Sequence, residues 1–361
     1  MDTRVRIAVV GPGRQAVQTI LGFWMANPKL VKIVSLGNAS GSGNGLNGKI
    51  GGGGNRGNTS AFEFPMEGIM PFNNIHEQIA AGDFDAIWMC QHAMDRVDVL
   101  IEALEAGHTV ISEKPLLVDP SQMDRLKEAM SKGRLIPLAV VEYIPQFAWL
   151  SQQIRELNLG KVISANFHRL CAPPDWSPKK FFDKDGGGAL FDLMVHNAYF
   201  INRAFGTEPQ ETLVQSCTVP GVPGNIPGDV TMLYRFANGN SHRVDSASVV
   251  DRATWGLPAG DENPPFDHGY NVIFEKGEVR LYKDPLKGTF ELAFRTSGHD
   301  QWKSPQLQNS DKNPDFEMTR AVIESVRTGA PIEALDPDRM FNVLETLFLA
   351  RTHLRSVGLP S

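Results

Sequence analysis

The sequence predicts an α/β protein: an N-terminal doubly wound parallel sheet, followed by a C-terminal α/β domain with a mostly antiparallel open sheet. Three observations predict this fold. Strand-like and helix-like stretches alternate up to about residue 145, strand-like runs dominate after it, and a glycine turn joins the first strand to the first helix. With 361 residues, 42% of them hydrophobic, the chain can form two cores, and we expect domains at residues 1–145 and 146–361.

The first half alternates between the two periodicities. The β-branched run from Val5 to Val10 predicts a strand, and Gln15 to Met25 has helical spacing. Further strands are expected at Leu30–Leu36, Asp85–Cys90, Thr109–Ser112 and Ile136–Val141, and further helices at Ile75–Ala81, Val97–Ala106 and Ser121–Met130. Because a helix between two strands carries the chain back across a sheet, this alternation predicts parallel strands.

The second half begins with a helix at Phe147–Leu157 and continues with strands that alternate apolar and polar residues. We expect strands at Val162–His168, Glu211–Thr218, Thr231–Phe236, Ser241–Val249, Gly269–Glu275 and Gly277–Tyr282. Asn238-Gly239 and Lys276-Gly277 are turn signals between such runs, which favours antiparallel pairing. Helices are predicted at about Gly188–Phe205, Asp315–Thr328 and Pro337–Val357.

Composition excludes several functions. Lys and Arg number 35 against 41 Asp and Glu, a formal net charge of −6 without long runs of one sign, so nucleic acid is not an expected partner. The three cysteines are far apart in the sequence and form no CxxC pair, so we expect reduced thiols, no disulfide framework and no metal site. The opening residues form a strand rather than an apolar leader, and no run approaches the ~18 apolar residues of a membrane span. A cytoplasmic protein without a membrane partner is expected.

A glycine motif follows the first strand. Gly11-Pro12-Gly13-Arg14-Gln15-Ala16 matches GxGxx(G/A), which is typical of dinucleotide-binding Rossmann folds. Gly11 permits the tight turn, Gly13 leaves room for a pyrophosphate, and Ala16 allows the helix to pack closely on the strand. The free N–H groups of the helix start favour the phosphates. We therefore predict NAD or NADP as cofactor, bound by Gly11, Pro12, Gly13, Arg14 and Gln15.

The end of the second strand bears on which cofactor is used. NAD-binding folds place a carboxylate there for the ribose hydroxyls, whereas this chain has Asn38, Ala39 and Ser40. Without a carboxylate nothing repels a 2′-phosphate, and Arg14 and Ser40 are suited to contact one, so the residues favour NADP. The alternative is that Asn38 hydrogen-bonds the ribose of NAD.

Residues 41–57 contain nine glycines in seventeen positions. Glycine loses the most backbone entropy on ordering, so we expect a mobile, solvated insertion unless a ligand holds it. The alternative is a flap beside the cofactor.

Two further motifs suggest chemistry. Glu113-Lys114-Pro115 follows the strand Thr109–Ser112, and a later helix carries Asp192 and His196 four residues apart after three glycines. In an α-helix this spacing places both side chains on one face. His196 is suited to exchange a proton with a substrate hydroxyl, and Lys114 to stabilise negative charge on its oxygen.

With these motifs the sequence resembles the family of glucose-fructose oxidoreductase, inositol dehydrogenase and the rhizopine-catabolism proteins, Gfo/Idh/MocA. The resemblance covers nearly the whole chain and includes GPGRQA, Glu113-Lys114-Pro115, GGGALFDLMVH up to His196, and Phe205-Gly206. It implies a nicotinamide cofactor, a sugar, cyclitol or related polyol as substrate, and a homo-oligomer, dimer or tetramer, formed through the open sheet.

Site residues follow from the resemblance by position. It implies that Lys114 lies beside the nicotinamide and the reacting oxygen, that Asp192 orients the substrate or the histidine, and that His196 is the acid/base. The remaining expected contacts are Gln91, His92 and Glu113 for the cofactor, and Tyr143, Arg169, Trp176, Asp192 and Asn197 for the substrate. The chain departs from the family pattern at Gln91-His92-Ala93 with Arg96, where Thr-Pro and a later His are common, and at Gln146-Phe147, where Arg-Phe is common.

The expected reaction is hydride transfer between a secondary alcohol or ketone and the nicotinamide. One alternative uses transient oxidation by a tightly held NAD to cleave a glycosidic bond, as a glycosidase or lyase. The other is a non-catalytic cofactor-binding regulator, and the joint presence of Lys114, Asp192 and His196 argues against it.

Overall fold

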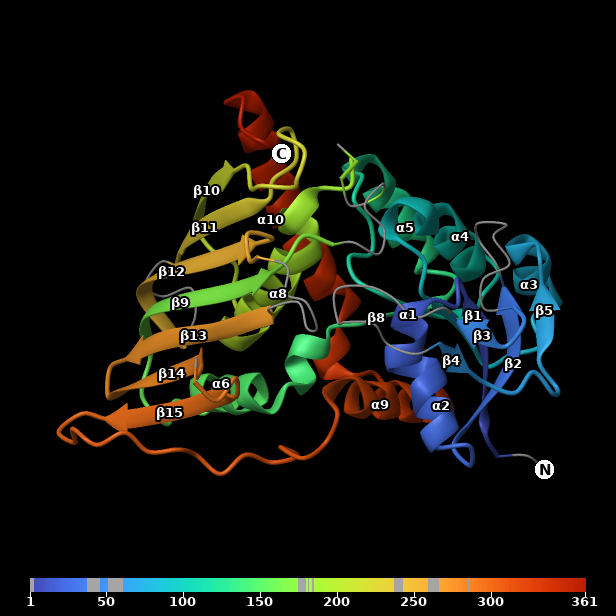
Figure 1. Ribbon diagram of the computed structural model, residues 1–361, viewed down its shortest axis with the longest axis horizontal. Helices are drawn as coiled ribbons and strands as arrows, with labels where there is room; N and C mark the ends of the chain where they lie inside the picture. Colours follow the sequence, from blue (N-terminus) through green and yellow to red (C-terminus); the bar gives the residue numbers. More distant parts are fainter. Residues whose placement is uncertain are drawn as a thin grey trace. The chain divides into compact units, whose positions relative to one another are not determined.

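The computed structural model describes residues 3–37, 46–50, 61–174, 180, 182–183, 185–236, 243–258, 266–284 and 286–361. The chain divides into two compact units (Figure 1). Unit 1 comprises Met1–Val140 and Lys312–Met340, and unit 2 comprises Val141–Asp311 and Phe341–Ser361. The predicted boundary at residue 145 assigns Lys312–Met340 to the second domain, whereas in the structure this segment belongs to unit 1.

The sheet of unit 1 is parallel at every pairing among its described strands. Its order is β5-β2-β1-β6-β7-β8. The strands are β1 (Val5–Val10), β2 (Val31–Gly37), β5 (Met70–Phe72), β6 (Ala86–Met89), β7 (Thr109–Ser112) and β8 (Arg134–Pro137). Their apolar residues are almost all buried, as parallel strands covered on both faces require. The prediction of a doubly wound parallel sheet is confirmed.

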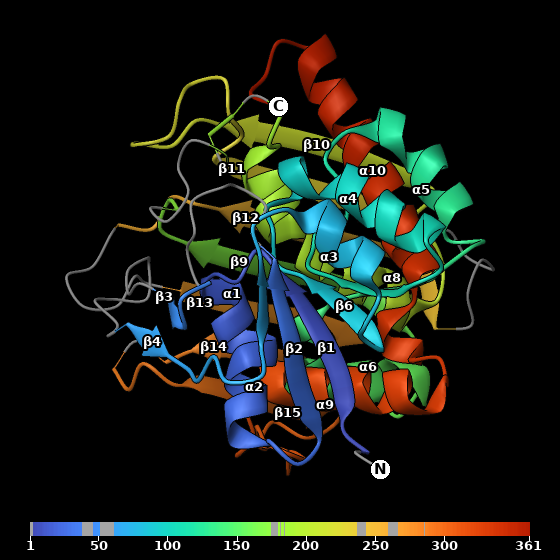
Figure 2. The same ribbon diagram turned by 90° about the vertical axis from the view of Figure 1, so that its right-hand side faces the viewer.

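The helices of unit 1 include the run that follows the glycine turn. This run is continuous but mixed: α1 (Arg14–Ala16), a π-helical turn η1 (Val17–Leu21) and α2 (Gly22–Ala26). The others are α3 (Ile75–Ala81), η2 (Pro120–Gln122), α4 (Ala93–Glu105), α5 (Met123–Ala129), α9 (Pro314–Thr328) and η5 (Glu333–Leu335). Figure 2 shows α2 beside α9, and the rings of Phe23 and Phe316 meet edge to face at 5.8 Å.

A small hairpin lies within the region expected to be mobile. β3 (Lys49–Ile50) pairs with β4 (Phe62–Glu63) in antiparallel register, and Ile50 is buried. The expectation of a wholly solvated insertion is therefore wrong for residues 49–50, because a paired strand here buries an apolar side chain. Residues 41–45 and 51–57 lie outside the described residues.

Unit 2 is built on a sheet of order β10-β11-β12-β9-β13-β14-β15. The strands are β9 (Val162–Cys171), β10 (Glu211–Cys217), β11 (Asp229–Arg235), β12 (Val244–Thr254), β13 (Phe266–Phe274), β14 (Gly277–Lys283) and β15 (Phe290–Thr296). Its pairings are antiparallel except for β12 with β9, so the mostly antiparallel sheet is confirmed. β15 was not predicted from the sequence.

Helices cover one face of this sheet. They are η3 (Val140–Tyr143), α6 (Pro145–Arg155), the π-helical η4 (Leu190–Met194) running into α8 (Val195–Phe205), and α10 (Pro337–Ser356). Phe147 of α6 packs edge to face on Phe200 of α8 at 5.1 Å and on Tyr270 of β13 at 5.2 Å. The opposite face exposes large apolar side chains, among them Leu213 and Leu233, which pair directly across β10 and β11.

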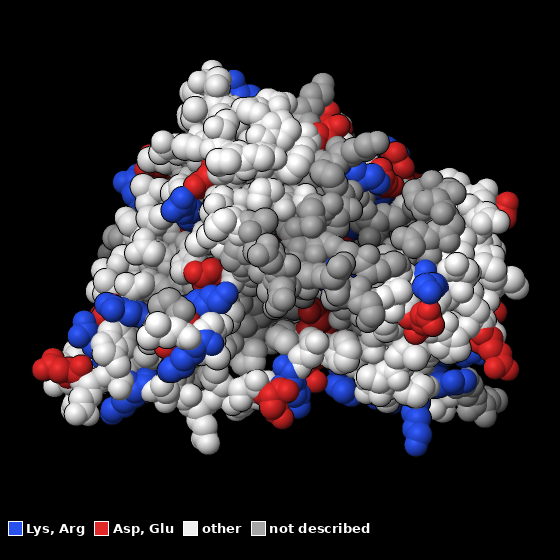
Figure 3. Space-filling model, viewed as in Figure 1, with Lys and Arg blue, Asp and Glu red and all other residues white. Residues whose placement is uncertain are grey.

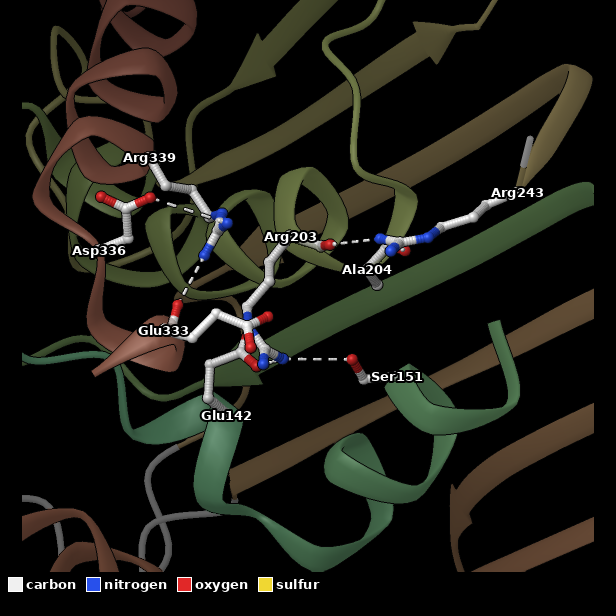
Figure 4. Close-up of polar contacts among 8 residues, drawn as sticks. All are labelled: Glu142, Ser151, Arg203, Ala204, Arg243, Glu333, Asp336 and Arg339. Carbon is white, nitrogen blue, oxygen red and sulfur yellow. Dashed lines mark hydrogen bonds and ion pairs between the residues drawn. The ribbon is translucent and has the colours of Figure 1, made fainter. Parts of the chain in front are cut away.

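Buried and capping arginines stabilise unit 2 (Figure 4). Arg203 donates to the carboxylate of Glu142 at 2.7 Å and to the hydroxyl of Ser151 at 3.3 Å. Arg243 donates to the Ala204 carbonyl at 3.3 Å and thereby satisfies a free carbonyl at the end of α8. In unit 1, Arg339 donates to the Glu333 carbonyl at 3.0 Å.

Surface charge agrees with the composition. On the face shown in Figure 3, basic and acidic side chains are interspersed among uncharged ones. Among the described residues, no helix combines the length and the apolar character that crossing a membrane requires.

Candidate active site

The glycine turn after β1 has the geometry that its sequence predicts. Gly11 has a φ of +65°, and its N–H donates to the Gly37 carbonyl of β2 at 2.9 Å. A Cβ on Gly11 would lie 2.9 Å from Cγ of Gln91 and 3.3 Å from its backbone nitrogen. Gly11 is therefore required both by its left-handed backbone and by the close approach of the loop after β6.

Gly13 differs from Gly11 in both backbone conformation and surroundings. Its backbone is extended, with a φ of −123°, and it immediately precedes α1. The nearest atom to a Cβ built on Gly13 is the Gly11 carbonyl oxygen, at 3.7 Å, so this side of the turn is open. Ala16 is fully buried against the sheet. This is the arrangement that allows a pyrophosphate to approach the backbone of the turn.

Two buried acceptors lie at the same edge of the sheet, after β6 and β7. Gln91 is 8% exposed and Glu113 7%, and in each the Oε1 atom is buried without a hydrogen-bond partner among the described residues. A side-chain hydrogen bond links Glu113 to Gln15 of α1. Acceptors of this kind suit ribose hydroxyls, so the residues present fit a dinucleotide.

The Glu113 carboxyl has an altered acidity. Its pKa is raised to about 7, mainly by burial; Arg96, Lys114 and the hydrogen bond from Gln15 oppose this rise, and nearby Asp315 adds to it. Near neutral pH both the neutral and the charged form of this carboxyl are therefore populated.

Lys114 is half-buried. It directly follows Glu113 and therefore lies just beyond the carboxyl end of β7. His92 is half-buried, and its Nδ1 accepts from the Met94 N–H at 3.4 Å, which caps α4. The structure thus places Gly11, Gln15, Gln91 and Glu113 close together within unit 1. Asn38 and Ser40 lie outside the described residues.

Sequence reasoning missed one residue of this edge as a functional candidate. Arg96 of α4 is 1% exposed and donates through Nη1 to the Gln91 carbonyl at 2.7 Å and through Nη2 to the Pro115 carbonyl. The sequence showed only a departure from the family pattern at this position.

In unit 2, Asp192 and His196 lie on one continuous helical run. Asp192 is in the π-helical η4 and His196 in the first turn of α8, so the four-residue spacing spans two helix types. The indole Nε1 of Trp255 donates to the Asp192 carboxylate at 3.2 Å. Trp255 is fully buried just after β12 and was also missed, because the sequence does not show which strand end faces this helix.

The other predicted substrate residues have varied surroundings. Asn197 is fully buried and donates to Asp251 at 2.8 Å. Arg169 is buried on β9, with its guanidinium 5.1 Å from the centre of the Phe266 ring. Tyr143 is half-buried, and its pKa is raised to about 12 by burial and by Glu142. Trp176 lies outside the described residues.

Two buried ionisable groups near Arg169 were not expected. Burial raises the pKa of Asp251 to about 7, against the opposing effects of Asn197 and Arg169. Burial and the positive charge of Arg169 lower the pKa of His268 to about 3, and its ring stacks on Phe290 at 4.2 Å. Within the described ranges, no group of three or more His, Cys, Asp and Glu side chains is arranged to hold a metal ion.

The two halves of the chain match two family models. Residues 5–140 match the family described as "Oxidoreductase family, NAD-binding Rossmann fold", and residues 147–280 match "GFO/IDH/MocA C-terminal domain". The chain belongs to the Gfo/Idh/MocA oxidoreductase family. The predicted family and the NAD-binding Rossmann domain are thus confirmed.

Curated members of the Gfo/Idh/MocA family are distant in sequence. The chain is 24% identical to 1,5-anhydro-D-fructose reductase of Ensifer adhaerens over 287 residues, which cover 72% of this chain and 83% of the relative. It is 22% identical to inositol 2-dehydrogenase of Rhizobium meliloti over 296 residues, covering 77% and 80% of the two chains.

Solved structures share the fold over almost the whole length. The WlbA dehydrogenase of Bordetella pertussis, in complex with NADH and UDP-GlcNAcA, superposes with a TM-score of 0.71 at 16% identity and covers 96% of this chain and 96% of its own. A variant of the 3-ketoreductase KijD10 of Actinomadura kijaniata, in complex with TDP-benzene and NADP, has a TM-score of 0.71, 16% identity and 97% coverage of both chains.

Proposed function

We propose that this oxidoreductase transfers a hydride between a secondary alcohol or ketone of a sugar, cyclitol or related polyol and the nicotinamide of NAD(P). The observation that carries the proposal is the position of Lys114. It follows β7 at the sheet edge where the Gly11 turn, Gln91 and Glu113 form a surface that fits a dinucleotide. The names of the curated relatives, a reductase of an anhydrosugar and an inositol dehydrogenase, support the substrate class.

The residues of unit 1 act on the cofactor and the reacting oxygen. When bound, the nicotinamide supplies the hydride acceptor or donor. Gly13 leaves its backbone open to the phosphates, and Gln91 and Glu113 accept hydrogen bonds from ribose. The ammonium group of Lys114 stabilises negative charge on the substrate oxygen, where such stabilisation lowers the barrier most.

The residues of unit 2 act on the substrate. His196 takes the hydroxyl proton during oxidation and returns it during reduction. Asp192, held by the indole of Trp255, orients the substrate or His196. Arg169, Tyr143, Trp176 and Asn197 are the proposed substrate contacts, and Asn197 would use its Oδ1 because its amide nitrogen is bound to Asp251.

We propose NADP as the preferred cofactor. β2 ends at Gly37 and is followed by Asn38, Ala39 and Ser40, so the chain offers no carboxylate at 38–40 to exclude a 2′-phosphate. We also propose a homo-oligomer formed through the exposed face of the unit 2 sheet, which light scattering of the purified protein tests.

The first experiment is thermal unfolding with NAD, NADH, NADP and NADPH in parallel. A ligand at a hundred times its Kd should stabilise the protein by ~2.7 kcal/mol. Selective stabilisation by NADP and NADPH would support the cofactor preference, and selective stabilisation by NAD and NADH would refute it. The absence of a shift with all four, in protein shown by mass spectrometry to be free of bound cofactor, would refute the proposed function.

Turnover then tests the chemistry. With a panel of sugars, cyclitols and other polyols and the cofactor that binds, Lys114→Met and His196→Asn should abolish the change in nicotinamide absorbance. Lys132→Met is the control, because Lys132 is an exposed lysine of unit 1 paired with Glu105. Full turnover by Lys114→Met would refute the assigned role. Release of an aglycone without net cofactor reduction would indicate the glycosidase alternative instead.

A further inference from the structure

Arg96 joins the two loops that carry the proposed nicotinamide-side residues. The loop after β6 contributes the carbonyl of Gln91, which accepts from Nη1 at 2.7 Å. The loop after β7 contributes the carbonyl of Pro115, which accepts from Nη2. Because the guanidinium is planar, its two donors hold these carbonyls at a set separation and orientation.

The Arg96 guanidinium is both buried and positively charged. Arg96 is among the largest fully buried side chains of the described residues. Its pKa is lowered to about 10, because burial outweighs the opposing effect of the nearby Glu113 carboxyl, so Arg96 remains a cation near neutral pH. Burying a cation is costly unless it is hydrogen-bonded or close to negative charge; the two carbonyls accept its hydrogen bonds, and the nearby Glu113 carboxyl favours its charged form.

The contacts of Arg96 lie on both sides of Lys114. The carboxyl of Glu113, the residue before Lys114, interacts electrostatically with the guanidinium. The carbonyl of Pro115, the residue after Lys114, accepts a hydrogen bond from it. The same loops also touch the cofactor turn, because Gln91 packs against Gly11 and Glu113 hydrogen-bonds Gln15. Each of the three loops, after β1, β6 and β7, is thus linked to the other two by these contacts.

We propose that Arg96 is a positioning residue, which sets the backbone of Lys114 relative to the Gly11 turn. This proposal rests on the proposed function, because it assigns Arg96 a part in presenting Lys114 to the reacting oxygen. Arg96 itself acts through the Gln91 and Pro115 carbonyls. Displacing a catalytic group by about 1 Å can cost roughly a hundredfold in rate. Loss of the two guanidinium hydrogen bonds of Arg96 should therefore affect turnover more than cofactor affinity.

The test compares two arginines of the same chemistry. Arg134, at the start of β8, also donates to two backbone carbonyls, Ser325 at 3.0 Å and Ala330 at 2.7 Å. It lies at the amino end of its strand and therefore at the sheet edge opposite the cofactor turn. Arg96→Lys and Arg134→Lys each keep the positive charge and remove the planar pair of donors that binds two carbonyls, so Arg134→Lys is the matched control.

The principal readout is the accessibility of Lys114 rather than activity. Purified protein is acylated with acetic anhydride, with and without a saturating concentration of the cofactor that binds best. The extent of Lys114 modification is then measured by peptide mass spectrometry, Kd by fluorescence quenching, and kcat with a substrate from the polyol panel.

In the wild type and in Arg134→Lys, cofactor should protect Lys114 from acylation. In Arg96→Lys, Kd should change by less than about threefold, whereas protection of Lys114 should be largely lost and kcat should fall by roughly a hundredfold. Wild-type protection and wild-type kcat in a folded Arg96→Lys variant would overturn the proposal. Equal losses in both variants would also overturn it.

Failure of the proposed function would give a different result. If none of the four nicotinamide cofactors binds the wild type, the function fails, and the rate of Lys114 acylation without cofactor still tests Arg96. A rate changed at least about threefold in Arg96→Lys, but not in Arg134→Lys, would support positioning, and a smaller change would overturn it.

A second variant covers loss of folding by Arg96→Lys. Arg96→Met with Glu113→Gln removes the buried cation together with the carboxyl beside it, and Glu113→Gln alone is its control. Because Glu113 is itself a proposed cofactor contact, these two variants are compared by the rate of Lys114 acylation without cofactor. That rate should differ by at least about threefold between the double variant and the control, and equal rates would overturn the proposal.

Discussion

Two glycines of the turn after β1, the proposed pyrophosphate site, should respond differently to alanine. In Gly11→Ala the new side chain must adopt a φ of +65° and lies 2.9 Å from Cγ of Gln91 and 3.4 Å from its Cα. The left-handed backbone costs about 1–2 kcal/mol for a residue with a Cβ, and displacing the Gln91 loop adds to this. We therefore expect a loss of about 1–3 kcal/mol, or roughly 2–12 °C in Tm for a unit of this size.

In Gly13→Ala the free protein should not be destabilised. Its φ of −123° is common for residues with side chains, and the nearest atom to the new Cβ is 3.7 Å away. Restricting the unfolded chain favours alanine by about 0.4–1 kcal/mol, but alanine is less favourable than glycine at an N-cap, so the two effects offset each other and the Tm should stay close to that of the wild type. In the proposed binding mode the same Cβ extends into the space of the pyrophosphate, so cofactor affinity should fall more than about tenfold.

The assay is thermal unfolding of the wild type and both variants, with and without each nicotinamide cofactor. Gly11→Ala should melt at a lower temperature without ligand, and Gly13→Ala should lose only the shift caused by cofactor. Unchanged cofactor affinity in Gly13→Ala would refute the assignment of this turn as the pyrophosphate site. An unchanged Tm in Gly11→Ala would refute the strain derived from its geometry.

Three further predictions concern unit 2. Burial raises the pKa of Asp251 from 3.8 to about 7, so the native state binds a proton that the unfolded chain has lost. Wild-type stability should then fall by up to roughly 4 kcal/mol as pH rises through this window, and Asp251→Asn should gain in Tm over the wild type at about pH 8 but not at about pH 4. Arg203→Met breaks a buried ion pair and should cost about 3–5 kcal/mol in urea unfolding, whereas Arg327→Met, which breaks an exposed pair, should cost less than about 1 kcal/mol. Trp255→Phe removes the donor to Asp192 and should lower kcat with a Tm loss of only a few degrees, and an unchanged kcat would contradict the positioning of that carboxylate.

Local chemistry was sufficient to predict the parts of the candidate site that lie within one strand and the turn after it. The run Val5–Val10 followed by Gly11 and Gly13 predicts strand, turn and helix, and the structure contains them at those residues. Lys114 follows the β-branched run of β7 for the same reason. The type of helix was not predicted. The π-helical turns at residues 17–21 and 190–194 depend on packing that periodicity does not encode.

The fold class and the ends of the strands that carry Gly11 and Lys114 were predictable from short stretches of sequence, because glycine dihedrals and apolar periodicity act over a few residues. Contacts between residues far apart in the sequence became known only from the folded chain. Arg96 lies 19 residues from Pro115, and Trp255 lies 63 residues from Asp192, yet each pair is joined by a hydrogen bond. Strand order and helix packing bring such groups together, and they are properties of the whole unit, so no short window of sequence contains them.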